Sequence, residues 1–129
     1  MTASPFLRGS EPLRRLVIAH RGARSLAPEN TLAAAQAALE MGADLWEFDI
    51  EVSRDGELVL LHDETLSRTT DAAARYPDRA PWRAADFTWE EIRALDAGSW
   101  FLREDPFGTL ASGTVPADRR ESLPAVRLK

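Results

Sequence analysis

The 129-residue chain contains no cysteine, which excludes disulfide bonds, thiolate-ligated zinc and a cysteine nucleophile. It has no apolar run near the roughly 18 residues that a membrane-spanning helix requires. Residues 1–15 lack the apolar core of a secretory signal, so we expect a soluble, cytoplasmic protein. The formal net charge of −5 disfavours binding to nucleic acid or to an anionic membrane surface.

What is present is typical of one globular domain. The apolar fraction of 44% and the charged fraction of 29% are close to the average for soluble proteins. The length is that of a single domain. Residues 1–15 are polar and without a period, so we expect them to be a lead-in to a domain over residues 16–129.

The first half of the domain reads as a strand–helix–strand unit. The apolar run Leu16–Ala19 ends at His20 and predicts a strand buried on both faces. A helix is expected to begin after Asn30 as N-cap and to end at Gly42. Residues 45–52 alternate strictly between apolar and acidic side chains, which predicts a second strand.

The second half carries weaker signals. Asp55-Gly56 predicts a tight turn before a further strand over Leu58–Leu61. Residues 64–122 look like an insertion, and most of them show no helix or strand period. The exception is Thr88-Trp89-Glu90-Glu91, which matches a capping box and predicts a short helix to Leu95.

Two histidines are the first candidates for chemistry. His20 and His62 each directly follow a predicted buried strand. Ligands bind at the carboxyl ends of strands in α/β folds, and histidine transfers protons near neutral pH. A single histidine here would more often be a packed one. Two at equivalent positions favour a role in catalysis.

Three carboxylates, Glu47, Asp49 and Glu51, fall on one face of the predicted second strand. Carboxylates this close on a covered face repel one another unless a cation is present, and Mg²⁺ or Ca²⁺ prefers such oxygen ligands. The alternative, a solvated face, stays open. Arg21 could fork onto a phosphate or form a surface ion pair, and Asp63 could orient His62 or cap a turn.

Taken in order, these segments resemble the N-terminal signature of the glycerophosphodiester phosphodiesterases. The resemblance covers roughly residues 16–126. It is carried by His20-Arg21-Gly22, Pro28-Glu29-Asn30-Thr31, Glu47-Phe48-Asp49, Asp55-Gly56, His62-Asp63, Arg68-Thr69-Thr70, Leu95-Asp96-Ala97-Gly98-Ser99-Trp100 and Leu123-Pro124. From the residues alone, Arg68-Thr69-Thr70 could contact a phosphate, but the hydroxyls of Thr69 and Thr70 are more typical of a turn.

The resemblance implies a (β/α)₈ TIM barrel that hydrolyses a glycerophosphodiester to glycerol 3-phosphate and an alcohol. His20 and His62 would be the catalytic acid–base pair, and Arg21 would bind the substrate phosphate. Glu47 and Asp49 would ligate a divalent metal, Ca²⁺ or Mg²⁺. Glu51 has no role in the family pattern.

The chain also departs from the family. A complete barrel needs about 200 residues or more, and the family takes a further metal-binding glutamate from a later strand. We therefore expect the N-terminal portion of an incomplete barrel, with uncovered apolar strand edges that favour self-association. The alternative to an active hydrolase is a silent fragment that binds metal or phosphate, or pairs with another chain.

Overall fold

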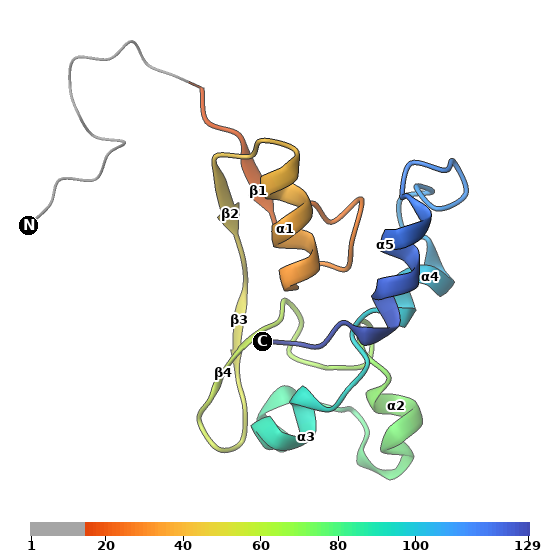
Figure 1. Cartoon of the computed structure of the whole chain (residues 1–129). Helices are drawn as coiled ribbons and strands as arrows, with labels where there is room; N and C mark the ends of the chain where they lie inside the picture. The colour runs from red at the N-terminus through yellow and green to blue at the C-terminus, as the bar shows by residue number, and fades with distance from the viewer. Residues whose placement is uncertain (1–14) are drawn as a thin grey trace, which may run out of the picture.

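The computed structural model describes residues 15–129, so all but the last residue of the expected lead-in lies outside it. Strands β1 (Ile18–His20) and β2 (Leu45–Glu47) pair in parallel, and helix α1 (Leu32–Glu40) connects them. The helix lies against this pair (Figure 1). The predicted strand–helix–strand unit is confirmed, and the chain is of the α/β class.

Helix α1 forms because its residues are mostly alanine and leucine, which are strong helix formers. The expectation that Asn30 is its N-cap is wrong. Thr31 is the cap, and its Oγ1 accepts a hydrogen bond of 3.2 Å from the backbone N–H of Ala34. Asn30 instead adopts a left-handed conformation, with φ of 55°, which asparagine tolerates better than most residues.

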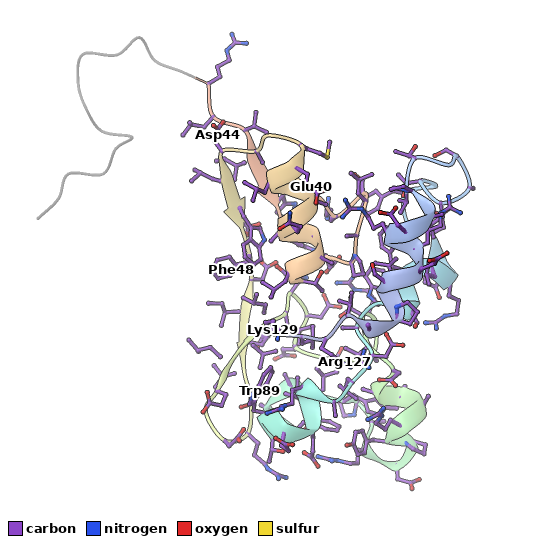
Figure 2. All side chains as sticks on the ribbon, in the orientation of Figure 1. Glu40, Asp44, Phe48, Trp89, Arg127 and Lys129 are labelled. Atoms are coloured by element: carbon purple, nitrogen blue, oxygen red, sulfur yellow. The ribbon has the colours of Figure 1, made fainter. Side chains whose placement is uncertain are left out.

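The single strand expected over residues 45–52 is also wrong, because it breaks at Phe48 and Asp49, the first of which is labelled in Figure 2. The second part, β3 (Ile50–Val52), turns away from β1 and pairs antiparallel with β4 (Leu58–Leu60). The break arises where the backbone N–H of Asp49 donates to the Asn30 side chain at 3.2 Å. The turn between β3 and β4 is confirmed, with Gly56 at a φ of +85°.

Residues 64–122, most of which show no period in the sequence, nevertheless form several short helices. The helices of this half are α2 (Ala72–Arg75), α3 (Trp89–Arg93), α4 (Ser99–Glu104) and α5 (Ala117–Ser122), and 3₁₀ turns occupy Pro77–Arg79, Ala84–Asp86 and Leu123–Ala125. Elements of three to six residues are too short to show a period. The capping box of α3 is confirmed, with reciprocal bonds between Thr88 and Glu91.

This second half contains the core. One cluster packs β4 against α3 and the segments around it, and its members are Val59, Leu61, Leu66, Ala72, Ala84, Phe87, Ile92, Leu95, Ala97 and Leu128. A smaller cluster comprises Trp100, Phe101, Val115 and Leu123. The last residues run beside β4, where the Leu60 N–H donates to the Lys129 carbonyl at 2.6 Å (Figures 1 and 2).

The strands are less buried than their apolar sequences predict. Val17, Ile18 and Leu58 are 61%, 57% and 66% exposed. Among the described residues each sheet has only two strands, which leaves much of their apolar surface without neighbouring elements to cover it. Among residues 15–129, no helix is long and apolar enough to cross a membrane.

Candidate functional site

The site begins where the parallel strands end. His20 is the last residue of β1, Glu47 is the last of β2, and the two are register partners. Parallel pairing therefore brings these side chains to the same edge, with His20 Nε2 3.8 Å from Glu47 Oε2. The side chains are 55% and 43% exposed, so a small molecule can reach them.

Arg21 occupies the turn that follows β1. Its backbone N–H donates to the Glu47 carbonyl at 2.9 Å and to Glu47 Oε2 at 3.2 Å. Arg21 has a φ of 60°, an uncommon conformation for a residue other than glycine. Such strain persists only where surrounding contacts impose it, and it is frequent at functional sites.

The Arg21 side chain lies between two carboxylates and is only 14% exposed. Its Nη1 donates to Glu29 Oε1 at 3.3 Å. Its Nε lies 3.2 Å from Asp49 Oδ2, which is an ion pair by distance, although this buried N–H makes no hydrogen bond. Asn30 completes the arrangement, because its Nδ2 donates to Asp49 Oδ2 at 3.0 Å.

His62 reaches the site from the other sheet, because it lies two residues after the end of β4. The Leu61 N–H donates to the Asp49 carbonyl at 3.1 Å, which holds the end of β4 beside the break between β2 and β3. His62 Nδ1 lies 2.7 Å from Asp63 Oδ1. Asp63 is in turn bound by Arg68, whose Nε donates to Oδ2 at 2.7 Å.

Arg68 closes the network by also binding Glu29. Its Nη2 donates to Glu29 Oε1 at 2.6 Å. The hydrogen bonds from Arg68 lower the pKa of Asp63 from 3.8 to about 2, against the opposing effect of burial. The same carboxylates raise the pKa of Arg68, so both groups are charged at every pH near neutrality.

The structure thus connects all the predicted site residues. Ion pairs and hydrogen bonds link His62 through Asp63, Arg68, Glu29 and Arg21 to Asp49, and the Arg21 backbone adds Glu47, whose carboxylate lies near His20. Glu51 lies on β3 outside this network.

Sequence reasoning missed Glu29, Asn30 and Arg68 as members of the site. Glu29 precedes α1, where a carboxylate also favours the start of a helix by its charge alone. The sequence feature that could have identified Glu29 as a site residue is its place in Pro28-Glu29-Asn30-Thr31, a segment of the resemblance. The interpretation of Thr70 as a turn residue is confirmed, because its hydroxyl donates to the Leu66 carbonyl at 2.6 Å.

The charges of this network favour a cation. The network contains four carboxylates (Glu29, Glu47, Asp49 and Asp63) and two guanidiniums, which leaves a formal charge of −2 with neutral histidines. Among the described residues, Oε1 of Glu47 and Oδ1 of Asp49 accept no hydrogen bond. No group of three metal-ligating side chains is found within residues 15–129. Mg²⁺ commonly binds one or two carboxylates and completes its shell with water and substrate phosphate, and Glu47 and Asp49 offer oxygen donors of that kind.

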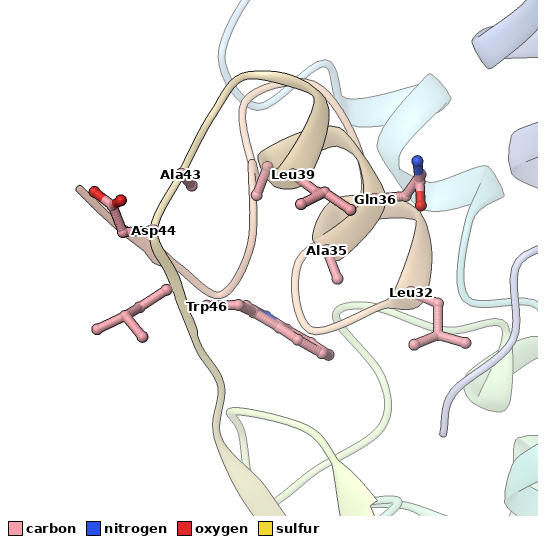
Figure 3. A pocket seen from close by; sticks show the side chains of 9 residues that line it. Leu32, Ala35, Gln36, Leu39, Ala43, Asp44 and Trp46 are labelled. Carbon is pink, nitrogen blue, oxygen red and sulfur yellow. The ribbon is translucent and has the colours of Figure 1, made fainter. Parts of the chain in front are cut away.

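Two hollows lie near α1. The larger, of about 430 Å³, lies between α1 and β2, and Figure 3 shows its apolar lining around Leu39 and Trp46. It contains none of the predicted site residues. The smaller, of about 350 Å³, includes His20 together with Arg24 and Phe107. The charged network, rather than the larger hollow, defines the site.

Residues 20–117 match the model of the glycerophosphoryl diester phosphodiesterase family. The chain is 45% identical over 106 residues to the glycerophosphoinositol inositolphosphodiesterase GDPD2 of Mus musculus, which covers 82% of this chain and 20% of that protein. It is 42% identical over 95 residues to a glycerophosphodiester phosphodiesterase of Bacillus subtilis, covering 74% of this chain and 30% of the relative.

A solved structure gives the same result. A phosphodiesterase of Oleispira antarctica, in complex with the product sn-glycerol-3-phosphate, superimposes with a TM-score of 0.63 at 32% sequence identity. The match covers 88% of this chain and 36% of that one. The chain therefore spans about a fifth to a third of the length of these relatives.

Proposed function

The chain belongs to the glycerophosphoryl diester phosphodiesterase family, and from that premise we propose that its site serves a metal-dependent hydrolysis. The substrate is a glycerophosphodiester, and the products are glycerol 3-phosphate and an alcohol. The observation that carries the proposal is the network that joins His20, Arg21, Asp49 and His62 at the ends of three strands.

In this proposal the two histidines transfer the protons. One of them deprotonates the attacking oxygen, and the other protonates the departing alkoxide. His62 suits such a role because Asp63 accepts the hydrogen of Nδ1, which leaves Nε2 able to take a proton. His20 is exposed beside Glu47, and in this proposal it is the second proton-transfer group.

Arg21 binds the phosphate in this proposal. Glu29 and Asp49 hold its guanidinium in place, so little side-chain freedom is lost when substrate binds. Glu47 and Asp49 would hold the cation, Ca²⁺ or Mg²⁺. A cation there supplies positive charge that stabilises the phosphodiester as its charge shifts in the transition state. Without it, the site charge of −2 repels an anionic substrate.

The fold proposal is the N-terminal portion of a TIM barrel. Its support is the parallel β1–α1–β2 unit with site residues at the strand ends, as ligands bind at the carboxyl ends of barrel strands. Residues 16–129 are the partial domain in this proposal, and residues 64–122 are its insertion. These residues fold into short helices that hold β4 and His62 in place.

A second candidate is a silent chain that binds metal or phosphate, or associates through its strands. Two observations favour it: no group of three side chains that could hold a metal ion is found among the described residues, and apolar side chains such as Ile18 on β1 and Leu58 on β4 are exposed. Two carboxylates bind a cation more weakly than three. The two candidates share a site and differ in turnover.

The deciding experiment measures hydrolysis of glycerophosphocholine by the purified chain with Ca²⁺ or Mg²⁺, and again with EDTA. Activity that EDTA and His20→Ala both abolish supports the hydrolase. Glu47→Gln should abolish the activity too. The matched control is Glu51→Gln, because Glu51 lies on β3 outside the network, and this variant should keep the activity. Absence of turnover alongside saturable cation binding would support the silent chain instead.

A further inference from the structure

Arg68 has more contacts than a surface arginine needs. Its Nε and Nη2 fork onto Asp63 at 2.7 and 3.0 Å, and its Nη1 and Nη2 fork onto Glu29 at 3.2 and 2.6 Å. All three nitrogens therefore bind carboxylate. A double fork of this kind fixes both partners in orientation as well as in distance.

The hydrogen bonds from Arg68 Nε and Nη2 restrain the Asp63 carboxylate against rotation. Its Oδ1 lies 2.7 Å from His62 Nδ1 and accepts from Arg68 Nη2, while its Oδ2 accepts from Arg68 Nε. Rotation about the carboxylate would break at least one bond to Arg68. The imidazole of His62 is 41% exposed, and among the described residues its hydrogen bond is to Asp63, which orients the ring.

The second fork anchors Arg68 to the phosphate-binding side of the site. Glu29 is only 9% exposed, and its Oε1 also accepts from Arg21 Nη1. Glu29 precedes α1, whereas Arg68 follows β4, so 39 residues of chain separate them. One buried carboxylate therefore sets the positions of both arginines.

We propose that Arg68 is a positioning residue: through Asp63 it keeps His62 in the tautomer that carries hydrogen on Nδ1 and presents a free Nε2 for proton transfer. Without Arg68, Asp63 would sample other rotamers and the imidazole would lose its fixed partner. The catalytic use of that nitrogen rests on the proposed function. The tautomer itself is a property of the folded chain and is measurable without turnover.

The test observes the imidazole nitrogens of ¹⁵N-labelled protein by NMR at a pH where the rings are neutral. The chain has only two histidines, so His20→Gln assigns both. In the unmodified chain, Nδ1 of His62 should show the shift of a protonated nitrogen, and Nε2 that of a bare one. Arg68→Gln should move His62 toward the Nε2–H form that a free imidazole prefers.

Arg79→Gln is the matched control. Arg79 also pairs with a carboxylate, Glu91, and donates to a backbone carbonyl, but it lies outside the site. It should lower thermal stability and leave the His62 nitrogens unchanged. Arg68→Lys retains the charge without the fork. It should give a smaller version of the same shift, and it replaces Arg68→Gln if that variant does not fold.

Activity measurements distinguish the positioning role of Arg68 from the proposed hydrolase function. Where the unmodified chain hydrolyses substrate, Arg68→Gln should lower kcat roughly tenfold to a hundredfold, by analogy with the residues that orient metal-ligating histidines. KM should stay within about threefold, because no contact with substrate is lost. A shifted tautomer in a chain without turnover supports the positioning role and counts against the hydrolase. Unchanged His62 nitrogens in folded Arg68→Gln overturn the positioning role, whatever the activity.

Discussion

Gly22 lets the turn that carries His20 and Arg21 lie directly against α1, and Gly22→Ala tests how much the fold depends on that contact. The residue has a φ of +83°, where an alanine costs about 1–2 kcal/mol. An added Cβ would also lie 2.6 Å from the Ala34 Cβ and 2.7 Å from its backbone carbon. Overpacking against backbone costs a further 1–3 kcal/mol or so. We expect a total loss of about 2–5 kcal/mol, much of the stability of a small domain.

The assay is urea unfolding followed by fluorescence of the four tryptophans. Gly56→Ala is the matched control, because Gly56 has a φ of +85° and its added Cβ would meet nothing within 4 Å. It should cost only the backbone part, about 1–2 kcal/mol. Equal losses in the two variants would refute the close approach of the turn to α1.

Two further predictions concern single interactions. Because the pKa of Asp63 is depressed in the folded chain, its ion pair contributes stability above the unfolded value of 3.8, and this is lost as pH falls toward about 2. After allowance for solvent screening the loss is on the order of 1 kcal/mol, and acid titrations of the unmodified chain and Asp63→Asn should differ by that amount. Thr88→Ala removes the cap of α3 and should cost about 1 kcal/mol in urea unfolding. A midpoint equal to that of the unmodified chain would show the cap to be dispensable.

The elements with the strongest local signals could be predicted from the sequence. An alanine-rich run, a turn of Asp55-Gly56 and a capping box at Thr88 each depend on neighbours within four residues. The same local logic placed His20 and His62 after strands. These predictions succeeded because the governing interactions are short in sequence.

Other features depended on contacts that a local pattern cannot contain. The alternation over residues 45–52 is unbroken, yet the strand divides because its two halves pair with different partners, β1 and β4. Asn30 is a good N-cap by type, but its side chain is taken by Asp49, 19 residues away. In both cases a tertiary hydrogen bond outweighed a local preference.

The candidate site divides in the same way. Residue types, strand ends and the family resemblance together made His20, Arg21, Glu47, Asp49 and His62 the candidates in the sequence. Only the tertiary structure showed that Glu29 and Arg68 link them, because that ion pair spans 39 residues of chain. A carboxylate before a helix looks like an ordinary partner of the helix dipole until folding brings two guanidiniums to it. Local chemistry determined which groups could act, and chain topology decided which of them meet.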